Sequence, residues 1–276
     1  MTVDLGKVFR TSLTYPFKKD VYLVLFVIQL IFGVASWLLT GYLGGEIIGP
    51  DGLPVMENII PFLLYFLPLS IAGWFVAILL FPAYLDNSAH FYKGKSRPII
   101  GSLEISRKRF LPMLAVFVVL GLIMLACFGG IILLMLSAMN MTSSEGLILA
   151  MIGGLWLIAG AVIGAIVIFT TFLSPVFCVL EKQKPLESIK KSWNLVVKNK
   201  WNTFLFFVIF VVVYVAIAVI GSTPEIAFES LYGLPVPLSV ESFLLMIIRI
   251  AVNSYLLLFT VSSMVSYYLG THKGSR

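Results

Sequence analysis

The chain has 276 residues, of which 60% are apolar and 12% are charged. An ordinary soluble domain has ~45–50% apolar and ~25% charged residues. Charged residues this scarce cannot cover the surface of a soluble protein, so much of the apolar surface must face lipid. The composition therefore excludes a soluble globular protein and predicts an integral membrane protein.

Six apolar stretches are long enough to cross a bilayer, which takes roughly 20 residues in a helix. None shows the strict alternation of a transmembrane β-strand, and a helix satisfies its own backbone polar groups within the lipid. The sequence predicts an all-α fold with six transmembrane helices, forming a single polytopic membrane domain over residues 1–276. The expected spans are residues 21–43, 59–81, 111–137, 147–177, 201–220 and 242–268.

The 19 Lys and Arg residues are distributed unevenly along the chain. They lie in the N-terminal segment, the second and fourth connections and the C-terminal tail, except Arg249, the single charged residue within the spans. The other three connections carry Asp and Glu but neither Lys nor Arg. The positive-inside rule then places both termini in the cytoplasm. The net charge of +6 reflects this topology and predicts no nucleic-acid partner.

Three amphipathic stretches, residues 3–17, 98–110 and 185–200, precede the first, third and fifth spans. Basic residues on the polar face of such a helix favour the headgroup layer of an anionic inner leaflet. We therefore expect three interfacial helices in the cell membrane of a prokaryote. The residues expected to contact this membrane are Phe9, Phe110 and Trp193, inserted among the lipids, and Lys190 and Lys191, facing the headgroups.

An internal repeat is a further prediction. Ser12-Leu13, Ser102-Leu103 and Ser188-Ile189 recur at nearly even intervals, and each pair precedes a helix, an acidic connection and a returning helix. This pattern indicates three copies of one amphipathic helix plus one hairpin. The alternative is that any membrane hairpin protein has polar residues at its helix ends.

The segment Ser188–Trp201, which reads SIKKSWNLVVKNKW and follows the helix end Leu173–Phe177, resembles a repeated segment of six-helix prokaryotic membrane families. One of these is the membrane domain attached to glycerophosphodiester phosphodiesterases; others are uncharacterised. The resemblance is best over residues ~160–270 and implies a six-helix membrane fold. These families supply no agreed catalytic residues, and the 276 residues contain no soluble phosphodiesterase segment, so that activity is not expected here.

Motifs that carry catalytic chemistry are missing from the sequence. The two histidines, His90 and His272, do not form a His-Glu-x-x-His zinc motif, and no Cys-x-x-Cys pair is present. A Gly-x-Ser-x-Gly elbow and a phosphate-binding loop are missing too. We therefore predict that the protein is not an enzyme and has no catalytic residue, metal site or cofactor.

Two groups of polar residues remain as candidate sites. Asp86, Asn87 and His90 lie near the inner end of the second span, either as a solvated helix end or as a proton-handling pair. Arg249 lies within the sixth span with Asn253 one turn deeper, and a charge inside a membrane marks a functional candidate. Arg249 is either a substrate or lipid site, with Gln29 as a possible partner, or a structural residue paired with Glu241, Glu225 or Glu229.

Small residues are frequent in the third and fourth spans, including Gly160-x-x-x-Gly164 and Ala126-x-x-x-Gly130. Such patterns let helices approach closely. We expect packing within the chain, with a homodimer face as the alternative.

Two classes of function are consistent with these features. The first is a non-enzymatic scaffold, assembly or lipid-interacting membrane protein with a possible membrane-protein partner. The second is a transporter or channel for a small or lipid-like substrate, in which three hairpins enclose a path. The scarcity of polar residues near the middle of the spans favours the first class.

Overall fold

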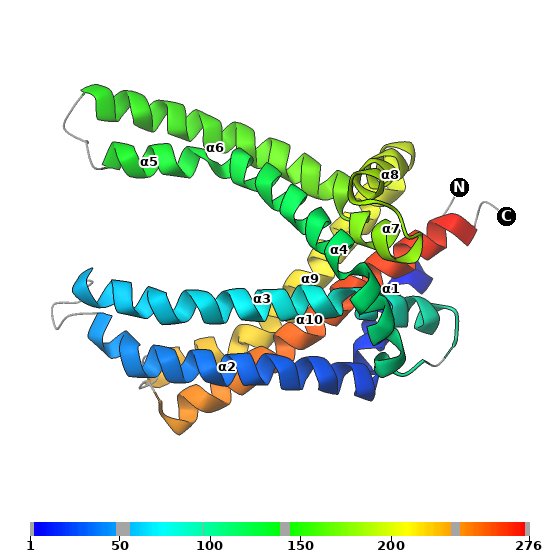
Figure 1. Ribbon diagram of the computed structural model, residues 1–276, viewed down its shortest axis with the longest axis horizontal. Helices are drawn as coiled ribbons and strands as arrows, with labels where there is room; N and C mark the ends of the chain where they lie inside the picture. Colours follow the sequence, from blue (N-terminus) through cyan, green and yellow to red (C-terminus); the bar gives the residue numbers. More distant parts are fainter. Residues whose placement is uncertain (1–2, 48–55, 96, 139–143, 233–237, 274–276) are drawn as a thin grey trace. The chain divides into compact units, whose positions relative to one another are not determined.

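The computed structural model describes residues 3–47, 56–95, 97–138, 144–232 and 238–273 (Figure 1). Every regular element in these residues is a helix. The N-terminal part contains α1 (Leu5–Thr14), the 3-10 turn η1 (Tyr15–Phe17), α2 (Lys19–Ile47), α3 (Met56–Tyr92), α4 (Ile99–Phe128) and α5 (Gly130–Ala138). The remainder contains α6 (Ser144–Thr171), α7 (Ser174–Leu180), α8 (Pro185–Lys198), α9 (Lys200–Tyr232) and α10 (Val240–Lys273).

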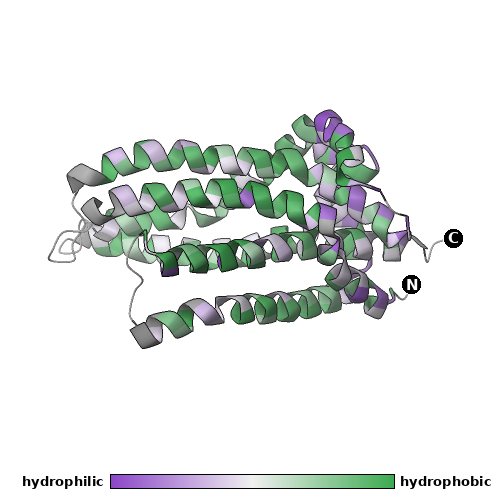
Figure 2. Cartoon of the chain, turned by 90° about the horizontal axis from the view of Figure 1, so that it is seen from below, coloured by the Kyte–Doolittle hydropathy of each residue, from purple (hydrophilic) through white to green (hydrophobic). Residues whose placement is uncertain are grey.

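The prediction of six apolar transmembrane helices is confirmed. Six stretches of the described residues are helical, long and apolar enough to cross a membrane: 20–42, 59–92, 99–137, 146–180, 200–228 and 240–272. Hydrophobic residues run along most of the length of the long helices (Figure 2). The 37 residues of α3 extend about 55 Å at 1.5 Å per residue. Because the hydrocarbon core is only ~30 Å thick, part of this helix projects into the headgroup layer or the water.

The second expected interfacial helix, residues 98–110, is wrong as a separate element. These residues form the first turns of α4, which continues through Pro112 to Phe128. The other two amphipathic stretches do form helices of their own. Pro16 and the 3-10 turn separate α1 from α2, and Asn199 separates α8 from α9.

Two of the expected spans are interrupted within their length. The third span breaks at Gly129, where the indole Nε1 of Trp156 donates to the carbonyl oxygen of Ala126 at 3.0 Å. The fourth span breaks between Thr171 and Ser174, just before Pro175, whose ring nitrogen has no proton to donate to the helix. At the second break, the Ser192 hydroxyl accepts from the Leu173 N–H and donates to the Thr170 carbonyl oxygen, so a side chain meets backbone groups at each break.

The chain divides into two compact units. The first contains Met1–Arg107 and Leu205–Arg276, and the second contains Lys108–Phe204. Within the first unit, α2 packs beside α3, and α10 contacts α1, α2 and α3 (Figure 1). Within the second unit, α6 packs against α5 and α8, and α7 packs against α8.

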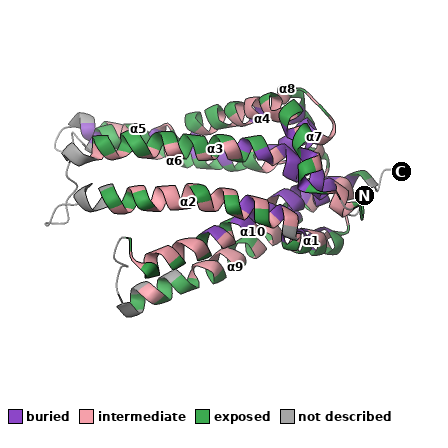
Figure 3. Ribbon diagram, turned by 60° about the horizontal axis from the view of Figure 1, so that its bottom comes forward, coloured by how far each residue is buried: buried purple, intermediate pink, exposed green. Residues whose placement is uncertain are grey.

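The core of the first unit lies toward the ends of α3 and α10 that are close to the chain termini (Figure 3). Buried residues run from Ile78 to Ala89 in α3 and from Ile250 to Thr271 in α10. Aromatic rings bind α9 to α10 there, with Phe206 4.5 Å from Tyr267 and Phe210 stacked on Phe259 at 5.5 Å. Toward the other end, the large side chains of these helices are mostly exposed or half-buried and are suited to contact with lipid.

The apolar face of α1 belongs to this core, which contradicts the expected insertion of Phe9 into the membrane. Only 9% of Phe9 is exposed, and its ring stacks on that of Phe206 at 5.6 Å. Val8 and Tyr15 are fully buried on the same side. An amphipathic pattern records only that one face avoids water, and here α9 and α10 cover that face.

In the second unit, glycines bring α4, α5 and α6 into close contact. A methyl group added at Gly160 would collide with the backbone carbonyl of Cys127, and one added at Gly130 would lie 2.7 Å from the carbonyl oxygen of Gly153. The packing expected within the chain for these small residues is therefore present at Gly130, Gly153 and Gly160.

Candidate functional site

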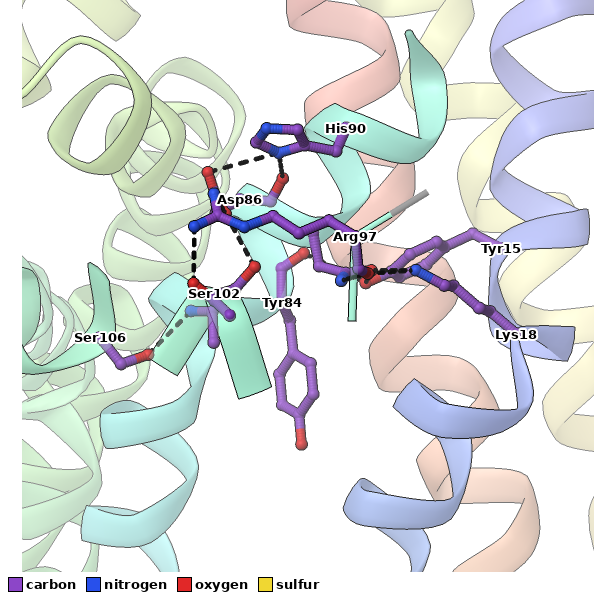
Figure 4. A network of polar contacts seen from close by, with 11 residues as sticks. Tyr15, Lys18, Tyr84, Asp86, His90, Arg97, Ser102 and Ser106 are labelled. Carbon is purple, nitrogen blue, oxygen red and sulfur yellow. Dashed lines mark hydrogen bonds and ion pairs between the residues drawn. The ribbon is translucent and has the colours of Figure 1, made fainter. Parts of the chain in front are cut away.

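A buried network of polar side chains joins three segments of the first unit (Figure 4). Tyr15 and Lys18 lie around the junction of η1 and α2, while Asp86, Asn87 and His90 belong to the last turns of α3. Arg97 precedes α4, and Ser102 and Ser106 lie in its first two turns. Hydrogen bonds connect the junction of η1 with α2, and the start of α4, to the last turns of α3.

Asp86 is the charged centre of the network. It is only 6% exposed, and its Oδ2 accepts from Arg97 Nη1 at 2.9 Å and from Ser102 Oγ at 2.8 Å. Arg97 also donates through Nη2 to the carbonyl oxygen of Gly101 at 2.6 Å. A buried carboxylate is tolerated when an opposite charge and hydrogen bonds compensate its lost hydration, and this arrangement supplies both.

Asn87, which is fully buried, connects the same region to η1 and α2. Its Nδ2 donates to the carbonyl oxygen of Arg97 at 2.7 Å, and that oxygen also accepts from Lys18 Nζ at 2.6 Å. The Tyr15 hydroxyl lies 3.3 Å from both Asn87 Oδ1 and the carbonyl oxygen of Tyr84, either of which can accept its proton. The three segments are thus fixed to one another by short polar contacts.

The pKa of Tyr15 is raised well above its ordinary value, chiefly by burial and then by the neighbouring Tyr84, Asp20 and Asp86. Burial favours the neutral phenol because the phenolate would lose its hydration. Tyr15 therefore acts as a hydrogen-bond donor throughout the physiological pH range.

The expected solvated helix end is wrong for Asp86 and Asn87, which are both buried. His90 is partly exposed, and its Nδ1 lies 2.9 Å from the carbonyl oxygen of Asp86 and 3.6 Å from Asp86 Oδ1. Arg97 and Ser102 both donate hydrogen bonds to the Asp86 carboxylate. The arrangement is therefore that of a structural contact that joins α3 to the start of α4. Sequence reasoning missed these partners because Arg97 stands before a proline in a basic connection and resembles a solvated charge.

Ser106 adds a contact at the proline of α3. Its Oγ accepts from the backbone N–H of Ala83 at 2.9 Å, directly after Pro82. A proline inside a helix disturbs the hydrogen bonds of its own turn. In the second unit, Ser192 acts comparably beside Pro175, accepting from Leu173 N at 3.2 Å and donating to the Thr170 carbonyl at 2.8 Å.

Arg249 and Asn253 lie in the first unit, toward the end of α10 that is remote from the termini. Both are exposed and both line a cavity of about 190 Å³ between α9 and α10. Arg249 also lines a second cavity, of about 360 Å³, between α2 and α10. The structure thus brings Arg249 and Asn253 together at one cavity.

Gln29 does not join this pair. Its Oε1 accepts from Ser254 Oγ at 2.7 Å, which links α2 to the adjacent position of α10. Among the described side chains, Glu241 forms no ion pair with Arg249, so the first candidate partner is not observed. The other candidates, Glu225 and Glu229, have side chains outside the described set.

The membrane-contact residues expected on α8 lie on its outward side. Trp193, Lys190 and Lys191 are exposed, whereas Ser188, Ser192 and Val196 form the buried face. Lys191 Nζ pairs with Glu181 Oε2 at 2.7 Å. Phe110, in α4, is half-buried.

Among the described residues, no three His, Cys, Asp or Glu side chains come together as a metal site.

Comparison with known proteins gives a family without an assigned activity. Residues 5–270 match the family described as Domain of unknown function (DUF7847), and the chain belongs to this family. No curated protein and no solved structure matches the chain. The match covers nearly all of the chain, so every candidate site described here lies within the family domain.

Proposed function

We propose that this chain is a non-enzymatic scaffold or assembly protein of a prokaryotic cell membrane that works through contact with the anionic inner leaflet. The observation that carries this proposal is the orientation of α8. Its serine face is buried against the protein, while Leu186, Trp193 and Val197 are 69%, 43% and 53% exposed. Such an arrangement leaves large apolar side chains available to lipid.

Lipid is favoured as the occupant of this surface by the residues that surround it. Trp201 and Phe204, at the start of the transmembrane helix α9, continue the exposed apolar surface along the chain. Lys190, Lys191 and Lys198 are exposed on α8 itself. Apolar side chains flanked by lysines suit the boundary between headgroups and acyl chains. A membrane-protein partner would be recruited by the same cytoplasmic segments.

The test is fluorescence quenching in nanodiscs, where both faces of the bilayer are accessible. The difference between the parent and Trp193→Phe isolates the emission of Trp193 from that of the other tryptophans. We expect quenching by lipids brominated along the acyl chain and protection from aqueous iodide. Iodide quenching without bromine quenching would place α8 in water and contradict the proposal.

Charge provides a second arm of this test. Lys190→Gln combined with Lys198→Gln should weaken bromine quenching of Trp193 in anionic nanodiscs, since each cation near an anionic surface contributes about 1 kcal/mol. The matched control is Lys93→Gln combined with Lys95→Gln, which removes two exposed cations from another segment. An equal effect of both pairs would show that the contact depends on total charge alone.

Transport of a small or lipid-like substrate is the second candidate, and the two cavities lined by Arg249 favour it. It predicts that purified protein in vesicles accelerates the exchange of a fluorescent phospholipid between leaflets, as measured by dithionite bleaching. Protein-free vesicles set the background rate. Exchange at that background rate would remove lipid transport from consideration and leave the scaffold proposal unaffected.

A further inference from the structure

We infer that ordered water molecules bind between α3 and α10, where they link buried hydroxyl groups that have no partner among the described residues. The hydroxyls belong to Tyr84 and Ser88 in α3 and to Ser262 and Ser266 in α10. All four residues are at most 1% exposed. The inference goes beyond the proposed function, because it concerns the core of the first unit and does not depend on α8.

The four hydroxyl residues lie at matching levels of two adjacent helices. α3 and α10 contact each other and run in the same direction (Figure 1). Near the ends of both helices, a Cβ added at Gly270 would lie 3.8 Å from the Tyr92 hydroxyl oxygen. Counting back four residues along each helix, about 6 Å at 1.5 Å per residue, reaches Ser266 and Ser88. Counting back four more reaches the remaining pair, and residues four apart share one face of a helix.

Burial makes these hydroxyls costly unless they are hydrogen-bonded. A buried polar group without a partner loses its hydration and gains nothing in return. Native proteins satisfy such groups with internal water, and each buried water typically makes about three hydrogen bonds. Hydroxyls on two adjacent helices can give one water several partners, which an isolated hydroxyl cannot do. The grouping of the four residues therefore favours bound water.

The chemistry of the group favours water over a metal cation. All four side chains are neutral, and each hydroxyl can both donate and accept a hydrogen bond. Hard cations select sites that supply carboxylate or carbonyl oxygens. The neighbouring carboxylate, that of Asp86, accepts from Arg97 and Ser102. The Tyr84 side chain extends away from that polar network (Figure 4).

X-ray radiolysis of the purified full chain in detergent tests for the water directly. Radiolysis converts water into hydroxyl radicals, which oxidise side chains beside a bound water even where bulk solvent does not reach. Peptide mass spectrometry should detect oxidised Tyr84 in the parent, and Ser262→Ala combined with Ser266→Ala should remove this product. Tyr15 is the matched control, because it is fully buried and its hydroxyl has protein acceptors. If Tyr84 is as unreactive as Tyr15, the inference is wrong.

Thermal unfolding in detergent provides a second, independent measurement. Tyr84→Phe removes only a hydroxyl, so the variant should fold. Loss of a water-bridged hydroxyl should lower the unfolding temperature by about 2 °C or more. An unchanged or higher unfolding temperature would indicate a hydroxyl without a bound water and would overturn the inference. A parent protein that is more stable in Na⁺ than in choline would indicate a cation site instead.

Ser263→Ala is the matched control for this measurement. The Ser263 hydroxyl is buried and has no partner among the described residues, but it shares its face of α10 with Phe259 and Tyr267. Those two rings pack on aromatic residues of α9, so this hydroxyl is surrounded by apolar groups. We expect Ser263→Ala to leave the unfolding temperature unchanged or to raise it. An equal fall in Ser263→Ala and Tyr84→Phe would count against water bound specifically between α3 and α10.

Discussion

Asp86 shows how a single buried charge can hold several segments together. Its carboxylate receives the Arg97 guanidinium and the Ser102 hydroxyl, and both partners come from outside α3. We expect Asp86→Ala to lower the free energy of unfolding by about 2 kcal/mol, because the buried Ser102 hydroxyl loses its charged acceptor and Arg97, whose side chain is 32% exposed, loses its ion-pair partner. Thermal unfolding in detergent, followed by circular dichroism, measures this loss.

The matched control for Asp86 is an ion pair of similar distance but greater exposure. Lys191 and Glu181 meet at 2.7 Å with side chains 45% and 24% exposed. Lys191→Ala should cost no more than about 1 kcal/mol, since solvent screens such a pair. A comparable loss in both variants would mean that burial does not set the contribution of Asp86.

Ser106 carries a second prediction at the residue scale. Ser106→Ala should cost about 1–3 kcal/mol, because the N–H of Ala83 would lose its acceptor in a buried position. Ser263→Ala provides the comparison, as the buried Ser263 hydroxyl has no hydrogen-bond partner among the described residues. We expect Ser263→Ala to change the unfolding temperature less than Ser106→Ala. The reverse order would show that the contact with Ala83 is not stabilising.

At the scale of elements, the same amphipathic pattern leads to two different environments. The apolar face of α1, including Phe9, is covered by α9 and α10, whereas α8 buries Ser188, Ser192 and Val196 and leaves Leu186, Trp193 and Val197 exposed. The pattern itself reports only the separation of polar from apolar residues. The contacts of the two covered faces differ, since the Phe9 ring of α1 stacks on Phe206, while the Ser192 hydroxyl of α8 bonds backbone groups of Leu173 and Thr170.

The crossing of α4 and α6 gives a prediction for glycine substitutions. Gly160→Ala should destabilise the second unit by about 2 kcal/mol or more, because the new methyl group meets the Cys127 backbone, which cannot turn aside. Gly154→Ala, on the same helix, adds a methyl group to open space and should be neutral or stabilising by up to about 1 kcal/mol. Equal unfolding temperatures of the two variants in detergent would contradict the close approach at Gly160.

At the scale of the whole molecule, the central prediction is the topology. Single cysteines replace Lys93, Lys182 and Glu241, which are all exposed. A membrane-impermeant maleimide on intact cells should label Glu241→Cys and should reach Lys93→Cys and Lys182→Cys only after permeabilisation. The parent is the background control, because Cys127 and Cys178 are buried. Labelling of the two lysine positions but not Glu241→Cys would reverse the topology.

The internal repeat stays a prediction at this scale. Ser106 and Ser192 each meet backbone groups close to the proline of an earlier transmembrane helix, which is what related copies would share. The three amphipathic stretches nevertheless differ in form, since the second continues into α4 without a break. The repeated sequence pattern therefore does not predict whether a break separates each amphipathic helix from the transmembrane helix that follows it.

The sequence by itself determined the six apolar helices, because lipid solvates only apolar side chains and a helix satisfies its own backbone. It also located Arg249, since one charge stands out among so many apolar residues. Only the tertiary structure decided that Asp86 is buried beside Arg97, that Phe9 packs on Phe206, and that Gln29 bonds Ser254 rather than Arg249. These outcomes depend on which helices pack against one another. Contacts between residues far apart along the chain leave no periodic pattern in the sequence.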